Sequence, residues 1–315
     1  MKEVRDEITQ ALVQINQMVI GKEEIVSKVL MAILAKGHIL LEDVPGVGKT
    51  TMALAFAKTM ELEQRRIQFT PDVLPSDVVG YTMITRENQK EIYKQGAVMC
   101  NLLLADEINR TSSKTQSALL EAMEEGRVTV DQVTREIKKP FIVIATQNPK
   151  GSIGTQLLPD SQLDRFMIQL SMGYPDPQSE VTMLKGHSKK QRFEGFHTII
   201  TREQLLCMQD EVDEVFIHDA IYEYIVYLLQ NTRNNIHIEQ GVSPRGGIAL
   251  MKMAKAVAYC YHRDYVIPDD IKYIFNDVIG HRIILSSQAR LDGLAKEDVL
   301  REVFEQTRIP RMAVS

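Results

Sequence analysis

A glycine-bearing loop over residues 43–51 is the stretch of this sequence best suited to chemistry. It follows a short apolar run, Ile39 to Leu41, of the kind that forms a buried parallel strand, and it leads into an apolar helical pattern. A strand, loop and helix in this order direct backbone N–H groups and a helix N-terminus at an anion. Lys49 adds a point charge for the outer phosphates, and the Thr50 hydroxyl can ligate Mg²⁺. The residues expected to bind the phosphates of a nucleotide are Asp43, Val44, Pro45, Gly46, Val47, Gly48, Lys49, Thr50 and Thr51.

The loop departs from the usual phosphate-loop pattern at one position. The pattern G-x-x-x-x-G-K-[ST] has a glycine where this chain has Asp43. Asp tolerates left-handed backbone geometry, so the loop can still form. A carboxylate that faced the phosphates would repel them, and we therefore expect the Asp43 side chain to point away. The alternative is a loop that merely joins a strand to a helix.

Polar side chains also follow two later apolar runs. Asp106 and Glu107 end the run that begins at Leu102, and Asn148 follows the run from Phe141 to Ala145. Ligands of open α/β sheets bind at the carboxyl ends of the strands. Asp106 is then placed to hold Mg²⁺ through water, and Glu107 to orient or deprotonate an attacking water. Asn148 could polarise the water or the γ-phosphate. The alternatives are a solvated acidic turn and a common Asn-Pro turn.

The composition is that of an ordinary globular protein and excludes several classes. The chain has 315 residues, of which 44% are hydrophobic and 25% charged, enough for two domains with a buried core. A net charge of −5 gives no support to a general nucleic-acid-binding surface. The three cysteines are far apart and suggest neither a disulfide framework nor a metal cluster. With no signal-peptide pattern and no apolar run long enough to span a bilayer, we expect a cytoplasmic protein that is not membrane-embedded.

The pattern of elements changes along the chain. Apolar runs of strand type alternate with helical patterns up to residue 175, which predicts a parallel sheet covered by helices on both faces. Alternation over residues 81–94 and 127–138 predicts two hairpins. Helical periodicity dominates afterwards. We therefore expect an α/β domain over residues 1–175 and a smaller, mainly helical domain over residues 176–315.

Taken together, these features resemble the AAA+ ATPases, and in particular the MoxR family of the helix-2-insert clade. The implied fold is a P-loop NTPase core of the AAA+ type followed by an all-α lid. In that family Asp43 stands where a glycine is usual, and Gly48 where an alanine is frequent. The resemblance covers almost the whole chain and rests on collinear motifs: QFTPDVLPSD at 68–77, LADEINR at 104–110, KTQSALLEAM at 114–123, EGRVTV at 125–130, IATQNP at 144–149, LDRF at 163–166, SPR at 243–245 and DVIGHRI at 277–283.

The resemblance implies a role for each residue near the phosphates. Glu107 would be the catalytic carboxylate, Asp106 the Mg²⁺ residue and Asn148 the sensor-1 residue. Arg165 would be the arginine finger, which reaches the γ-phosphate bound by the neighbouring subunit. A guanidinium there would stabilise charge on the transferring phosphoryl group. The alternative for Arg165 is a surface ion pair with Asp164.

Arg245 would be the sensor-2 residue of the lid. Ser243 is expected to be the N-cap of a helix and Pro244 its first residue, which puts Arg245 in the opening turn. From there it could bridge to the phosphates, although a solvated arginine near a capped helix is the alternative. Val19 and Ile20 resemble the adenine-side segment of the family. The two hairpins match the family's helix-2 insert and pre-sensor-1 hairpin.

We therefore expect an Mg²⁺-dependent ATPase that binds ATP and ADP and acts as a chaperone-like remodelling motor on partner protein complexes. Hydrolysis completed between subunits implies a homo-oligomeric ring, expected to be a hexamer. The resemblance suggests a partner with a von Willebrand factor A domain, and the client is not identified by the sequence. One alternative, which Asp43 keeps open, is a nucleotide-dependent partner-binding switch with little turnover. Another is a chelatase or DNA-directed motor of the same clade, although the acidic balance weighs against nucleic acid.

Overall fold

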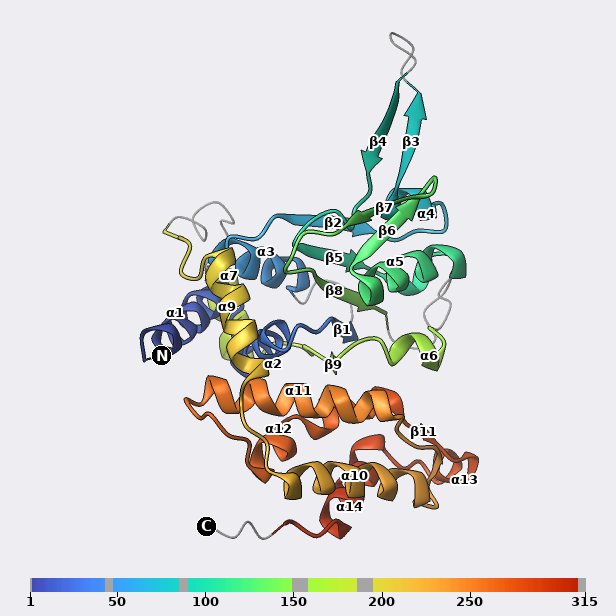
Figure 1. The fold of residues 1–315 in the computed structure, drawn as a ribbon. Coiled ribbons are helices and arrows are strands. Elements are labelled where there is room, and N and C mark those ends of the chain that lie inside the picture. The colour runs from blue at the N-terminus through green and yellow to red at the C-terminus, as the bar shows by residue number, and fades with distance from the viewer. Residues whose placement is uncertain (1, 43–47, 85–89, 149–157, 186–194, 311–315) are drawn as a thin grey trace. The chain divides into compact units, whose positions relative to one another are not determined.

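The computed structural model describes the chain except for residues 1, 43–47, 85–89, 149–157, 186–194 and 311–315 (Figure 1). The chain forms two compact units. Unit 1 contains Met1–Val29, His38–Pro159 and Leu170–Leu206, and unit 2 contains Leu30–Gly37, Asp160–Gln169 and Cys207–Ser315. The expected division into functional domains at residue 175 stays a prediction.

A five-stranded sheet with the order β2-β5-β8-β1-β9 forms the centre of the α/β fold, and the pairs β2–β5, β5–β8 and β8–β1 are parallel. The expected fold class is therefore confirmed. Its strands are β1 (Ile39–Glu42), β2 (Gln64–Gln68), β5 (Leu102–Asp106), β8 (Ile142–Gln147) and β9 (Ile168–Leu170). All of β5 and nearly all of β8 are buried, which explains their continuous apolar sequences. β2 lies at the edge and is largely polar, because an edge strand is covered less completely.

Helices pack on this sheet and begin and end at recognisable residues. α5 starts after Ser112, whose hydroxyl accepts a hydrogen bond from the Thr115 N–H, and ends at Gly126 in the left-handed conformation with φ 63°. A serine at the N-cap and a left-handed glycine after the last turn are typical boundaries of a helix. The helical segments from the N-terminus to α9 are α1 (Lys2–Met18), α2 (Glu23–Leu34), α3 (Lys49–Thr59), α4 (Pro75–Val79), η1 (Ile108–Arg110), α5 (Ser113–Glu125), α6 (Asp160–Leu163), α7 (Pro177–Lys185) and α9 (Arg202–Asp213).

Both expected hairpins are present in unit 1. They are β3 (Gly80–Ile84) with β4 (Glu91–Gln95), and β6 (Arg127–Val130) with β7 (Val133–Glu136). Asp131 and Gln132 form the two-residue turn of the second hairpin with positive φ angles of 50° and 65°. In Figure 1 the first hairpin projects beyond the sheet. The Arg135 guanidinium lies 4.0 Å from the centre of the Tyr93 ring and so joins the two hairpins.

Unit 2 is mainly helical, as expected for the second part of the chain. α11 packs on α10 and α12, and buries Leu250, Met253 and Val257 along one face. Its elements after α9 are α10 (Asp219–Asn234), β10 (Ile238–Gln240), α11 (Pro244–Cys260), α12 (Pro268–Ile279), η2 (Gly280–Arg282), β11 (Ile284–Leu285), α13 (Ser287–Leu291) and α14 (Lys296–Gln306). In the described part of the chain, no helix combines the length and the apolar character needed to cross a bilayer.

Candidate functional site

The N-terminus of α3 carries the described part of the expected phosphate loop. Gly48 precedes the helix in the left-handed conformation with φ 98°, which a residue without a Cβ atom adopts readily. Lys49 is the first helical residue and is buried, and Thr50 and Thr51 are half-buried in the same turn. The other expected phosphate-binding residues, Asp43, Val44, Pro45, Gly46 and Val47, lie outside the described residues, as does the predicted orientation of Asp43.

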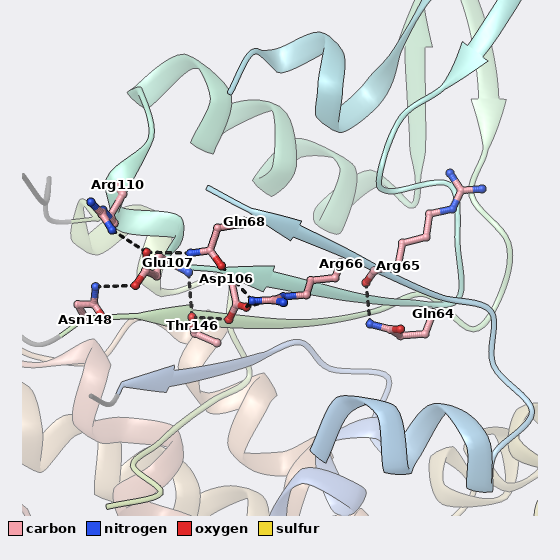
Figure 2. Close-up of polar contacts among 9 residues, drawn as sticks. All are labelled: Gln64, Arg65, Arg66, Gln68, Asp106, Glu107, Arg110, Thr146 and Asn148. Atoms are coloured by element: carbon pink, nitrogen blue, oxygen red, sulfur yellow. Dashed lines mark hydrogen bonds and ion pairs between the residues drawn. The ribbon is translucent and has the colours of Figure 1, made fainter. Parts of the chain in front are cut away.

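Asp106 at the end of β5 is buried and held by two neighbouring strands. Its Oδ1 accepts a hydrogen bond from the Thr146 hydroxyl of β8 at 3.2 Å. Its Oδ2 accepts one from Arg66 Nε of β2 at 2.8 Å, and the Arg66 Nη2 lies 2.7 Å from the same oxygen. An edge-strand arginine therefore supplies the positive charge beside this carboxylate (Figure 2).

Glu107 receives hydrogen bonds from three side chains that belong to different elements. Its Oε1 accepts from Asn148 Nδ2 at 3.2 Å, and its Oε2 accepts from Gln68 Nε2 at 2.8 Å and from Arg110 Nη1 at 2.9 Å. Its own N–H donates to the Thr146 hydroxyl at 2.8 Å. Figure 2 shows Gln68, Arg110 and Asn148 converging on the carboxylate.

The electrostatic surroundings keep Glu107 ionised. Burial raises the pKa of its carboxyl, but hydrogen bonds from Arg110, Asn148 and Gln68 together outweigh burial and hold the pKa below its ordinary value. Glu107 is also the N-cap of η1 and adopts the left-handed conformation with φ 56°. This conformation is uncommon for a residue with a long side chain.

Asn109 fixes the backbone of Asn148 from both sides. The Asn148 N–H donates to Asn109 Oδ1 at 3.3 Å, and Asn109 Nδ2 donates to the Asn148 carbonyl at 3.2 Å. Asn109 is almost fully buried. Asn109, two positions after Glu107 in the sequence, therefore holds the backbone of Asn148 so that its side chain points at the Glu107 carboxylate.

The structure brings the candidate residues Asp106, Glu107 and Asn148 together and adds residues that were not predicted. Gln68 belongs to a recognised motif and pairs with Asp106 in the register of β2 and β5, which is the signal that could have identified it. Thr146 directly follows the apolar run from Phe141 to Ala145 and belongs to the IATQNP motif, but no pattern in the sequence marked its hydroxyl as a partner of Asp106. The unpredicted members are Arg66, Gln68, Asn109, Arg110 and Thr146.

The remaining predicted site residues lie at other places. Val19 is buried and Ile20 half-buried just after α1. Arg165 follows α6 in unit 2 and is half-buried. Arg245, also in unit 2, is exposed in the first turn of α11, where Pro244 and the Ser243 cap occupy the expected positions. Asp164 pairs with Arg282 at 2.7 Å.

The chemistry of the donors fits an Mg²⁺–nucleotide complex. The Asp106 carboxylate and the Thr50 hydroxyl are hard oxygen ligands, and the first turn of α3 offers N–H groups to phosphates. Within the described ranges, no group of three or more His, Cys, Asp or Glu side chains is arranged to hold a metal ion.

Comparison with known proteins agrees with this geometry. Residues 38–168 match the family model "ATPase family associated with various cellular activities (AAA)", and residues 230–303 match the model of the AAA lid domain. The chain is 49% identical to the uncharacterized protein YeaC of Bacillus subtilis, over 96% of this chain and 94% of that one. It is 36% identical to Chaperone MoxR1 of Mycobacterium tuberculosis, over 97% of this chain and 83% of that one.

Solved structures have the same fold. A crystal structure of a presumed ATPase from Cytophaga hutchinsonii has a TM-score of 0.91 and 36% identity, over 98% of this chain and 96% of that one. A full-length MCM homolog from Methanopyrus kandleri has a TM-score of 0.61 at 16% identity, covering 90% of this chain and 62% of that one, which is a likeness of fold alone. This chain belongs to the MoxR-type AAA ATPases and carries the AAA core and lid of that family.

Proposed function

We propose that this protein hydrolyses ATP with Mg²⁺ and uses the energy to remodel partner protein complexes. The observation that carries the proposal is the arrangement around Glu107, an ionised carboxylate at the carboxyl end of the sheet. It stands beside Asp106 and is aimed by Asn148. This arrangement suits a base that activates water, and the family supports ATP as the substrate.

In the proposed mechanism, one set of residues binds the nucleotide and another accepts the proton of the attacking water. Lys49 and the N-terminus of α3 bind the phosphates, and Thr50 and Asp106 are the proposed Mg²⁺ residues. When bound, Mg²⁺ neutralises charge on the phosphate oxygens. Asp106, which contacts Arg66 in this structure, would supply a carboxylate oxygen to the ion.

Glu107 then accepts a proton from the attacking water. Its low pKa keeps it in the basic form at neutral pH, and the Asn148 amide orients it. Of its three side-chain partners, Gln68 and Arg110 both hold Oε2. When Gln68 and Arg110 let go of Oε2, this oxygen can accept a proton from water, while Asn148 still donates to Oε1.

We further propose that Arg165 is an arginine finger acting on the neighbouring subunit and that Arg245 senses the nucleotide of its own subunit. Val19 and Ile20 are proposed to lie on the adenine side. Such a site requires a homo-oligomeric ring, and a hexamer is the expected size. The relative named Chaperone MoxR1 supports a chaperone-like role. A von Willebrand factor A domain protein stays the expected partner.

Steady-state ATP hydrolysis by the purified full-length protein tests this proposal. The wild type is expected to turn over in the presence of Mg²⁺ and to stop when Mg²⁺ is chelated. Glu107→Gln should lower kcat by about 100-fold or more while binding of a fluorescent ATP analogue persists. Glu125→Gln, an exposed carboxylate at the end of α5, is the matched control and should behave as the wild type.

A nucleotide-dependent switch with little turnover is the second candidate. The observation that favours it is the set of three hydrogen bonds on Glu107, because each one makes the carboxylate a weaker base. Tight ATP binding with no Mg²⁺-dependent turnover in the wild type would favour the switch over the motor. Stimulation of turnover by DNA would instead favour a DNA-directed motor.

A further inference from the structure

A cluster of polar side chains in unit 2 surrounds the backbone at Arg165. Asp164 Oδ1 accepts a hydrogen bond from Arg282 Nε at 2.7 Å, and Asp164 Oδ2 accepts one from the Ser243 hydroxyl at 2.9 Å. The Arg282 side chain is only 2% exposed. We refer to Asp164, Ser243 and Arg282 as the Asp164 cluster. Asp164 belongs to the segment Asp160–Gln169 of unit 2, whereas Ser243 and Arg282 belong to the segment Cys207–Ser315 of the same unit.

The remaining N–H groups of Arg282 face main-chain carbonyls and the His281 ring, whose Nε2 lies 2.8 Å from Nη1. Nη2 donates to the carbonyls of Phe166 at 2.6 Å and Asp164 at 3.3 Å. Nη1 donates to the carbonyl of Met167 at 3.2 Å and also to that of Val278 at the end of α12. Carbonyls on both sides of Arg165 are therefore held by one buried guanidinium. Since α6 has only four residues, this side chain does more to fix the segment than the helix does.

Ser243 extends the cluster to the first turn of α11. Its hydroxyl oxygen accepts from the Gly246 N–H at 3.4 Å while its own hydrogen goes to Asp164. The turn also packs directly on Arg282, because a Cβ atom at Gly246 would lie only 2.8 Å from Arg282 Cδ. Arg245 lies between Ser243 and Gly246. The backbones that carry Arg165 and Arg245 thus belong to one connected block.

The chemistry of the cluster indicates positioning rather than stability alone. A buried ion pair loses much of its attraction to desolvation, and apolar side chains of similar volume often stabilise a protein as well. A planar guanidinium, however, fixes direction by donating to several acceptors at once, which apolar side chains cannot do. Here those acceptors are the carbonyls that flank Arg165.

We propose that Asp164 and Arg282 are positioning residues that set the placement of Arg165 and join it to the start of α11. The inference rests on the proposed action of Arg165 on the neighbouring subunit. Arg165, which acts on the nucleotide of the neighbouring subunit, and Arg245, which senses the nucleotide of its own subunit, then move as one block. Hydrolysis in one subunit consequently depends on the nucleotide state of the next.

Mixing two impaired full-length variants tests the proposal. Asp164→Ala subunits keep Glu107 but offer a misplaced Arg165, whereas Glu107→Gln subunits cannot hydrolyse ATP but offer a correctly placed Arg165. Asp164→Ala alone should lose roughly 10-fold to 1000-fold in kcat, the larger value approaching the loss of an arginine finger. An equimolar mixture should exceed the summed rates of the separate variants several-fold, because Glu107→Gln subunits serve the sites of their neighbours.

Two controls separate this proposal from the proposed function. Arg165→Ala mixed with Glu107→Gln should regain activity in the same way, and Asp160→Ala, an exposed carboxylate at the start of α6, should keep the wild-type rate. If Arg165→Ala is rescued and Asp164→Ala is not, Asp164 is merely structural and the inference is overturned while the function stands. If Arg165→Ala is not rescued, the action of Arg165 between subunits is wrong and this inference falls with it, whereas the proposed ATP hydrolysis is still decided by the turnover of the wild type and Glu107→Gln.

A second variant guards against misfolding. Arg282→Lys keeps the buried charge but donates from a single nitrogen, so it cannot hold the flanking carbonyls with the same geometry. It should show the same loss and the same rescue with unchanged circular dichroism and unchanged binding of an ATP analogue. A wild-type rate in both Arg282→Lys and Asp164→Ala would overturn the inference.

Discussion

Glu107 in unit 1 and Asp164 in unit 2 are both carboxylates paired with arginine, but their surroundings differ in kind. Glu107 accepts from three side chains on different elements, and its arginine, Arg110, is 42% exposed. Asp164 pairs with Arg282, which is 2% exposed and bonded to main-chain carbonyls. The side chains that bind Glu107 can rotate away from it. Arg282 can leave Asp164 only if it also gives up its hydrogen bonds to main-chain carbonyls. The first carboxylate is therefore suited to changing partners during a reaction and the second to keeping them.

Removing the buried arginine is the strongest way to break this comparison. Arg282→Leu is expected to reduce the free energy of unfolding by about 3–5 kcal/mol, because Asp164 and several carbonyls lose their donor. Arg290→Leu, which removes an exposed arginine 3.4 Å from Glu239, is the control and should change it by less than about 1 kcal/mol. Urea denaturation followed by circular dichroism measures both. Equal effects in the two variants would contradict the distinction between the surroundings.

His38 sharpens the comparison because it shows whether main-chain partners also fix a side chain in unit 1. Its Nδ1 accepts from the Val143 N–H at 3.0 Å, so the neutral ring carries its proton on Nε2 and donates to the Met123 carbonyl at 3.1 Å. Burial lowers the pKa of His38 to about 4, although the hydrogen bond to Met123 opposes this. Below the unfolded pKa of about 6.5 the unfolded chain takes up the proton first, so stability falls as the pH falls.

The expected loss from His38 is roughly 2–3 kcal/mol between pH 6.5 and pH 4. Denaturation at a series of pH values measures it. In His38→Gln this contribution disappears and the slope becomes shallower, although the variant starts less stable at pH 8. His262→Asn, at an exposed position, should keep the wild-type slope. An unchanged slope in His38→Gln would show that another group causes the acid sensitivity.

The smallest expected effect is on the stability of the Glu107 site itself. Glu107→Gln should change the free energy of unfolding by less than about 1 kcal/mol at neutral pH, because the partly exposed partners can bind water instead. The folded pKa of Glu107 is lowered, so its contribution is present above the unfolded pKa and disappears as the pH falls through the folded one. The wild type and the variant should therefore converge in stability at acid pH. A large loss at neutral pH would mean that this carboxylate is structural.

The sequence predicted those parts of the fold that are expressed in local patterns. β5 and β8 are buried on both faces, so they appear as continuous apolar runs, and parallel pairing brings their carboxyl ends to one edge. This is why Asp106, Glu107 and Asn148 were identified as neighbours. The cap residues Ser112 and Gly126 are likewise local signals for the ends of α5.

The sequence did not predict contacts that depend on packing between distant segments. Arg66 lies on a polar edge strand, where an arginine is normally solvated, and only the register of β2 brings it to Asp106. Arg282 is separated from Asp164 by 118 positions, and no periodicity relates the two. Thr146 acts through a hydroxyl inside an otherwise apolar strand. In each case the residue type is common in proteins, and its role depends on the residues that the fold places beside it.

The left-handed backbone of Glu107 sets function against stability at a single position. In this conformation a residue with a long side chain lowers the free energy of unfolding by about 1–2 kcal/mol. Glycine or asparagine at the same position would largely restore that stability. A selection for thermal resistance alone would therefore favour replacing Glu107, the residue that we propose as the catalytic base. Variants evolved for heat tolerance without a demand for ATP hydrolysis should lose Glu107 early. Retention of glutamate there under such selection would mean that the folded chain needs this carboxylate for more than chemistry.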